Sequence, residues 1–306
     1  MMKYLSKIIL VFLLIPVASQ SQPIQEQCRP FNISIPDFTG PEKFKSGLLW
    51  EITRNNRVMG HIFGTIHVDD NRILNIPVEV RDALDSSDYY AMEVVPSAQD
   101  AMDISMSMFF MDGNRLDLII SPQLFDRTVG ILEQHNMGED IVALMQPWAA
   151  YIIMSYPADM GIILDLHLLD IARKNGAQIT SLETSTEQIE IFSDMELDDQ
   201  VRILADTVCH YDSMLSDFNE LKRLYLNRDL EGLYIQAQKY SFEDDEVYEE
   251  ISNRLISERN QRMTMRIVEL LNIGKAFIAV GAMHLPGEDG ILNLLETDGY
   301  TLLRKY

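Results

Sequence analysis

Basic residues are scarce in this chain. Its 306 residues include 25 lysines and arginines against 47 aspartates and glutamates, a formal net charge of −22 at pH 7. A nucleic-acid-binding protein needs a basic surface for the phosphate backbone, so this balance excludes nucleic acid as a partner. It also disfavours binding to anionic membrane surfaces. A strongly acidic protein instead attracts cations, divalent metal ions included.

Cysteine is nearly absent, since Cys28 and Cys209 are the two in the sequence. They are not arranged as Cys-x-x-Cys. In an oxidising compartment they are candidates for one disulfide bond, and two buried thiols are the equally plain alternative. Cys28 follows the polar run Gln25-Glu26-Gln27, unlike the small apolar run of a lipoprotein signal. Lipid anchoring at Cys28 is therefore not expected.

Glycine is sparse, with 15 residues and no glycine-rich loop of the kind that cradles phosphates. Neither Gly-x-Ser-x-Gly nor His-Glu-x-x-His occurs. These are the patterns of serine hydrolases and of one large group of zinc proteases. The sequence therefore gives no support to nucleotide use, to hydrolysis by a serine or cysteine nucleophile, or to that zinc chemistry.

A marked apolar run occurs once, at the N-terminus. Lys3 and Lys7 flank the start of the apolar run 8–15, and the small residues Ala18 and Ser19 follow it. This order predicts a cleaved signal peptide over residues 1–22, with an uncleaved anchor as the alternative. No later stretch approaches membrane-spanning length. We therefore expect an exported protein, periplasmic or secreted, with no stable membrane span after cleavage.

The remaining chain divides into an arm and one domain. Residues 23–44 are polar and punctuated by proline, which indicates an extended N-terminal arm, and residues 45–306 are long enough for one large core. Short apolar runs bounded by turn residues predict strands. They cover 48–52 and 58–63, joined as a hairpin at Asn55-Asn56, then 89–96, 178–183, 276–280 and 300–303.

Helical patterns dominate between these strands. They cover 77–84, 121–138, 141–156, 161–174, most of 185–240, 247–272 and 290–297. Since strands cluster at the two ends of the chain, the ends must meet to form one sheet. We expect an α/β fold with a mixed central sheet, formed by N- and C-terminal strands and flanked and capped by helices.

Methionine is concentrated in one segment. Met102, Met106, Met108 and Met111 lie within eleven residues, 101–111. Ordinary helix core is the simpler interpretation. The alternative is an adaptable cleft for apolar substrate chains, because methionine is flexible and fits irregular apolar surfaces.

Two loops carry the same histidine pattern. Gly64-Thr65-Ile66-His67 ends one expected strand, and Gly281-Ala282-Met283-His284 ends another. Imidazole is a common ligand of transition-metal ions, and Glu93 on an intervening strand would complete a set of two histidines and one carboxylate. Such a set leaves positions open for water or substrate. By spacing alone, however, Gly-x-x-His is a weak signal.

Several separated motifs strengthen that interpretation. They are Phe63-Gly64-Thr65-Ile66-His67, Met92-Glu93, Gln146-Pro147-Trp148, Gly161-Ile162-Ile163-Leu164-Asp165, Ser181-Leu182-Glu183-Thr184 with Glu187-Gln188, Glu258-Arg259-Asn260, and Val280-Gly281-Ala282-Met283-His284-Leu285-Pro286-Gly287. In this order, from about Leu48 to Leu303, the chain resembles the TraB/GumN family. That family is related to the Tiki metalloproteases and, more distantly, to the erythromycin-esterase and ChaN-like proteins.

The resemblance implies a metal-dependent hydrolase that acts on a peptide or protein substrate, and the signal pattern at the N-terminus makes it an exported one. The family's functional positions map onto His67, His284 and Glu93 for a Mn, Co or Zn ion, with Glu93 as a ligand or a general base. Arg259 would stabilise an oxyanion or orient a carboxylate. Glu183 is a candidate acceptor behind a ligating histidine, or a cap for the following helix.

Two other functions stay open from the sequence. The ChaN-like branch suggests a metal- or haem-binding protein without turnover, and a catalytically silent interaction protein is the third candidate. The oligomeric state has no signal in the sequence.

Overall fold

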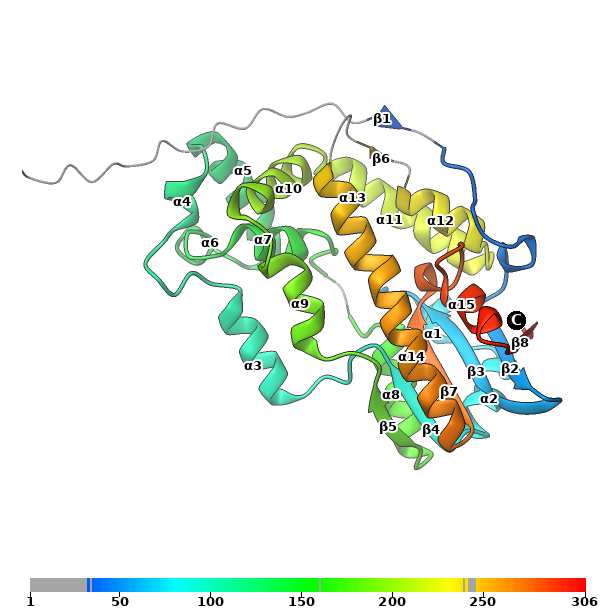
Figure 1. The fold of residues 1–306 in the computed structure, drawn as a ribbon. Helices are drawn as coiled ribbons and strands as arrows, with labels where there is room; N and C mark the ends of the chain where they lie inside the picture. The colour runs from blue at the N-terminus through cyan, green and yellow to red at the C-terminus, as the bar shows by residue number, and fades with distance from the viewer. Residues whose placement is uncertain (1–31, 34, 160, 239, 242–245) are drawn as a thin grey trace, which may run out of the picture.

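A six-stranded mixed sheet lies at one end of the molecule, with helices around it (Figure 1). The computed structural model describes residues 32–306 except 34, 160, 239 and 242–245. The sheet order is β5-β4-β7-β3-β2-β8. The bounds are β2 Leu49–Arg54, β3 Arg57–Thr65, β4 Tyr89–Met92, β5 Gln178–Ser181, β7 Ala276–Gly281 and β8 Thr301–Arg304. Strands from both ends of the chain thus build one sheet, as the sequence predicts.

The four strands β5, β4, β7 and β3 run parallel to one another. At one edge β2 pairs antiparallel with β3, and β8 pairs antiparallel with β2. The β2–β3 hairpin turns at Asn55 and Asn56, which have φ values of 51° and 58°. Two consecutive left-handed residues define the tight hairpin turn that asparagine tolerates well. The predicted hairpin is therefore confirmed.

Helices cover both faces of the sheet. On one face lie α14 (Glu258–Ile273) and α15 (Ile291–Thr297), and on the other lie α2 (Val78–Asp85) and α8 (Leu164–Lys174) (Figure 1). The strand β7 is buried along its length, since Ala276 to Val280 are all inaccessible to solvent. A central parallel strand covered on both faces is expected to be continuously apolar. This explains why the run 276–280 shows no alternation.

The middle of the chain forms a helical lobe with its own apolar core, built around residues such as Leu132, Trp148 and Leu204. Its elements are α3 Ala98–Ser107, α4 Leu116–Ile119, α5 Pro122–Leu132, α6 Glu139–Val142, α7 Pro147–Met154, α9 Ser185–Ser193, α10 Leu197–Cys209 and α13 Glu246–Ser252. This lobe is the helical cap that the sequence predicts.

The remaining elements include one long helix, α11, and several short ones. They are β1 Asn32–Ile33, β6 Tyr240–Ser241, α1 Asn71–Leu74, α11 Tyr211–Leu226, α12 Leu230–Gln238, and short turns at Glu42–Phe44, Glu133–His135 and Ala282–His284. In the described part of the chain, no helix is both long and apolar enough to cross a membrane.

Several expected helices are divided in the structure. The segment 141–156 is two helices, because Pro147 lacks an N–H donor and starts α7 at its first position. The segment 185–240 is four helices with short breaks. The segment 247–272 contains a π-helical turn at Asn253–Ser257, directly before α14. A π-helical turn inserts an extra residue into the helical turn, so it changes the direction in which the following side chains point.

The structure describes only part of the expected arm. Within the expected arm, Phe44 is fully buried in the main core and residues 42–44 form a short 3-10 turn, while the division of the chain into arm and domain stays a prediction. The apolar Phe44 ring packs in the core although the residues next to it in the sequence are polar. The predicted signal peptide over 1–22 and the arm residues 23–31 lie outside the described residues.

Candidate functional site

Four strands deliver side chains to one rim of the sheet. The parallel strands β3, β4, β7 and β5 have their carboxyl ends on the same side, and they are followed by His67, Glu93, His284 and Glu183 respectively. The carboxyl rim is where open α/β sheets usually bind ligands. In the register of β3 and β7, Thr65 lies opposite Gly281. The two Gly-x-x-His loops are therefore neighbours in space.

The first loop is fixed by a buried carboxylate. Nδ1 of His67 lies 2.9 Å from Oδ2 of Asp165, and the Thr65 hydroxyl donates to Oδ1 of Asp165 at 2.6 Å. Asp165 is in the first turn of α8 and is 3% exposed. Since a carboxylate accepts, the imidazole donates from Nδ1, and Nε2 remains for other chemistry.

The second loop has an equivalent support from another helix. Nδ1 of His284 lies 2.7 Å from Oδ1 of Asn260, which is fully buried in α14. The Asn260 amide in turn donates to the carbonyl of Asp289 at 2.8 Å, which fixes its orientation. His284 therefore also presents Nε2 away from its support.

Glu93 lies between these groups. Its Oε1 accepts from the Gly281 N–H at 2.7 Å, and its Oε2 accepts from Nη2 of Arg259 at 2.6 Å. Oε1 is 3.8 Å from Nε2 of His284. That separation is too long for a hydrogen bond. It approaches the roughly 3.4 Å between two donors that share one ion at about 2.1 Å each in tetrahedral geometry.

Arg259 is held between two carboxylates. Its Nε donates to Oε2 of Glu183 at 2.9 Å and its Nη2 to the same oxygen at 2.8 Å, while Nη2 also reaches Glu93. Glu183 is 1% exposed and accepts from Arg262 at 2.8 Å. The sequence suggested Glu183 as a histidine acceptor or a helix cap. Its partners are instead two arginines and Gln188, and Thr184 with Glu187 forms the capping box of α9.

The electrostatic environment gives the two histidines different pKa values. Burial lowers the pKa of His284 to about 4, although the charge of Glu93 opposes this shift. Burial also acts to lower the pKa of His67, but the hydrogen bond to Asp165 and the charges of Asp165 and Glu93 raise it to about 8. Burial would raise the pKa of Glu93, yet His284 and Arg259 bring it to about 2, so this group is a carboxylate at neutral pH.

The donor set can be compared with what a metal ion needs. Ligating histidines almost always donate their second ring nitrogen to an oxygen acceptor, and both His67 and His284 do so. The residues therefore fit a transition-metal ion through two Nε2 atoms and a carboxylate oxygen of Glu93. Within residues 32–306, apart from the undescribed positions, no three His, Cys, Asp or Glu side chains already form a ligand cluster.

Two supporting residues were not singled out from the sequence. Asp165 and Asn260 each occur in a quoted motif, but their partners are 98 and 24 residues away in the chain. The need of each histidine for an oxygen acceptor was the available signal. The sequence interpretation gives the role of histidine acceptor to Glu183. In the structure Glu183 lies on the same rim but supports Arg259.

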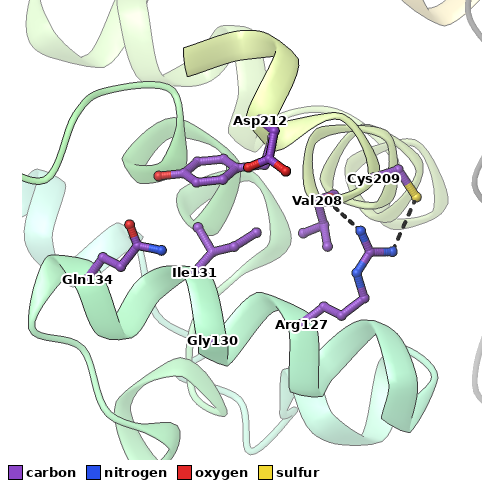
Figure 2. Close-up of a pocket in the computed structure, with 8 residues that line it drawn as sticks. Arg127, Gly130, Ile131, Gln134, Val208, Cys209 and Asp212 are labelled. Atoms are coloured by element: carbon purple, nitrogen blue, oxygen red, sulfur yellow. Dashed lines mark hydrogen bonds between the residues drawn. The ribbon is translucent and has the colours of Figure 1, made fainter. Parts of the chain in front are cut away.

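The second cysteine lies in the helical lobe, in a part of the fold separate from the histidine loops. Cys209 ends α10 beside a pocket of about 390 Å³, where Arg127 of α5 reaches its Sγ at 3.7 Å and the carbonyl of Val208 at 2.9 Å (Figure 2). The Cys209 sulfur is not a free thiol. Cys28 lies outside the described residues, so the pairing of Cys28 with Cys209 stays a prediction.

One family description matches the chain. The model of the TraB/PrgY/gumN family matches residues 48–304, which include all four rim residues and both histidine supports. No curated protein and no solved structure matches the chain.

Proposed function

The chain belongs to the TraB/PrgY/gumN family, and from the chemistry of its two Gly-x-x-His loops we propose that it is an exported metal-dependent hydrolase. The bond cleaved would be a peptide or related acyl bond. The observation that carries the proposal is the matched support of His67 by Asp165 and of His284 by Asn260. Ligating histidines almost always donate their second ring nitrogen to such an acceptor, so this support leaves each Nε2 as the atom that would bind a metal ion.

His67, His284 and Glu93 are the residues that would hold a Mn, Co or Zn ion. When bound, such an ion polarises a carbonyl group and makes a water molecule more acidic. Glu93 would act as a ligand or as a general base, and its carboxylate is ionised at neutral pH. The resemblance to Tiki metalloproteases supports a peptide as the substrate class.

Arg259 would supply positive charge where an acyl oxygen becomes negative. Glu93 and Glu183 fix its guanidinium in place, so it needs no rearrangement during a reaction. Preorganised donors of this kind are the largest single contribution in many hydrolases. Burial of the group, at 8% exposure, strengthens its field by excluding water.

The test combines metal content with turnover. The wild-type protein should bind one Mn, Co or Zn ion per chain, cleave members of a peptide library, and lose cleavage in a chelator until metal is returned. His67→Ala and His284→Ala should lose both metal and cleavage while keeping the circular dichroism spectrum of the wild type. His167→Ala, a histidine on α8 outside the site, is the matched control. A His284→Ala protein that keeps metal and activity contradicts the proposal, and metal binding without cleavage of any peptide favours the ChaN-like alternative.

A further inference from the structure

A methionine-lined pocket lies at the ends of two helices that start from the candidate site. Its volume is about 510 Å³, within the size range of ordinary ligand pockets. The walls come from the last turn of α3, the segment that follows it, and the end of α9. The lining includes Met106, Phe109, Phe110, Met111, Gln146 and Ser193.

The methionines of this segment are mostly not core residues. Met102, Met106 and Met111 are 60%, 49% and 77% exposed, and α3 buries no residue at all. The simpler interpretation from the sequence, ordinary helix core, is therefore wrong for these three. Exposed methionines and aromatic rings grouped around a hollow are typical of adaptable binding surfaces.

The apolar surface continues onto a neighbouring segment. The Phe110 N–H donates to the carbonyl of Leu144 at 2.9 Å, which brings residues 108–112 and 144–146 together. Leu144 and Ile141 are 43% and 44% exposed. The pocket is therefore part of a larger apolar patch and not an isolated gap.

The pocket is connected to the site through both helices. α3 begins at Ala98, five residues after Glu93, and α9 begins at Ser185, two residues after Glu183. The two helices pack against each other (Figure 1). Residues at the last turn of each helix line the pocket. A helix of about ten residues rises about 15 Å, and an extended peptide covers that length with roughly five residues. One peptide can therefore reach from the rim to the pocket.

Asp112 lines the pocket, and two more carboxylates neighbour its lining residues in the chain, Asp103 one turn before Met106 on α3 and Asp194 next to Ser193. Asp103, Asp112 and Asp194 are exposed, and their hydrogen-bond partners are the neutral side chains of Gln99, Asn114 and Ser193, with a backbone N–H also donating to Asp112. In the described part of the chain, none of these three carboxylates pairs with a lysine or arginine. Negative charge around an apolar hollow is complementary to a segment that carries both basic and apolar side chains.

From this arrangement we propose that the pocket is a substrate subsite, which takes an apolar side chain of a basic peptide about five residues from the bond held at the histidines. The apolar side chain fills the methionine-lined hollow, and the lysines or arginines beside it face the three aspartates. The placement of the cleaved bond rests on the proposed hydrolase function, whereas binding of the peptide at the pocket does not.

The test measures binding and turnover separately. Fluorescence anisotropy would follow labelled twelve-residue peptides of lysine and leucine, against matched peptides with glutamate for lysine or serine for leucine. We expect the lysine–leucine peptide to bind tightest. The double variant Met106→Ser/Met111→Ser should weaken it at least fivefold. Met265→Ser, an equally exposed methionine at 63% on α14, should leave it unchanged.

Charge reversal gives a second, independent variant. Asp103→Lys/Asp112→Lys should weaken the lysine–leucine peptide at least fivefold and strengthen the glutamate–leucine peptide. If the peptide is cleaved, the methionine variant should raise KM with kcat little changed. Peptide binding without cleavage leaves the subsite standing and overturns the hydrolase function alone. Three results would overturn the subsite. They are equal binding of all peptides, no effect of the double variants on peptide binding, and an effect of the variants seen only on self-association or on binding to vesicles.

Discussion

The Gly281 N–H donates to Oε1 of Glu93 at 2.7 Å, which joins the end of β4 to the start of the second histidine loop. The other oxygen of the same carboxylate accepts from Arg259, so one acidic group links a strand, a loop and a helix. A side chain added at Gly281 would approach Oε1 to 3.2 Å. Glycine at this position therefore allows the carboxylate to lie against the backbone of the loop that carries His284.

Removing the guanidinium of Arg259 should destabilise the protein strongly. Arg259→Ala removes the partner shared by Glu93, whose side chain is 12% exposed, and by Glu183, which is buried and keeps Arg262. Breaking a buried pair in this way costs about 3–5 kcal/mol. The measurement is the free energy of unfolding in urea.

Arg266→Ala is the matched control on the same helix. Arg266 pairs with Glu187, but their side chains are 37% and 25% exposed, so the loss should be about 1 kcal/mol or less. Equal destabilisation by the two variants would show that Arg259 is not held as a buried ion pair.

Asp165→Asn should weaken metal binding without unfolding the chain. The substitution keeps the size of the side chain but removes the negative acceptor behind Nδ1 of His67. Loss of such an outer support typically costs 10- to 100-fold in metal affinity. Calorimetric titration with Zn or Mn would measure the change.

His167→Asn, two residues further along α8, serves as the control because, among the described residues, that side chain makes no hydrogen bond to either histidine loop. The His167→Asn variant should bind the metal ion with the same affinity as the wild type. An Asp165→Asn protein that binds metal within twofold of the wild type would remove the supporting role assigned to Asp165.

Much of the fold follows from local pattern, whereas the supports of the site do not. The hairpin at Asn55-Asn56 and the apolar run of β7 are local signals, and the parallel strands then bring His67, Glu93 and His284 to one rim. The contact of His67 with Asp165 joins residues 98 apart, and no periodicity predicts which helix will supply that carboxylate. The exposure of Met106 is likewise set by the packing of α3 and not by its sequence.

His61 should make the protein sensitive to acid. Burial, and then the positive charge of Lys275, lower the pKa of this histidine in β3 to about 4 from 6.5. Between these values the unfolded chain binds a proton that the folded chain does not, so stability falls as the pH drops from about 6.5 to 4. At about 1.4 kcal/mol for each pKa unit, the loss is about 3 kcal/mol at most.

His61→Phe keeps a buried ring and removes the titration, together with an Nδ1 atom that has no hydrogen-bond partner. Free energies of unfolding at pH 7, 5.5 and 4.5 should fall less steeply for the variant than for the wild type. The difference between the two proteins isolates residue 61 from every other titrating group. Parallel pH curves would mean that His61 titrates near its ordinary value in the folded protein.

Gly64→Ala should disturb the contact between the two histidine loops. A methyl group at Gly64 would meet Cδ1 of Leu285 at 2.8 Å and Cα of Ala282 at 3.0 Å, in the short turn that carries His284. Replacing glycine by alanine usually stabilises by about 0.4–1 kcal/mol through the unfolded chain. Overpacking a tight core costs about 1–3 kcal/mol, and here it acts against backbone atoms that have little room to move.

We therefore expect Gly64→Ala to lower the free energy of unfolding by about 1–2 kcal/mol and to weaken metal binding about tenfold, because Ala282 and His284 shift together. Gly130→Ala is the matched control, since nothing lies within 4 Å of its added methyl group and it is inside α5. That variant should gain about 0.5–1 kcal/mol, because alanine favours a helix more than glycine does. Urea unfolding and metal titration of both variants decide the point. If Gly64→Ala is as stable as Gly130→Ala and binds metal equally well, then β3 and the His284 turn are not packed closely enough to hold two imidazoles on one ion.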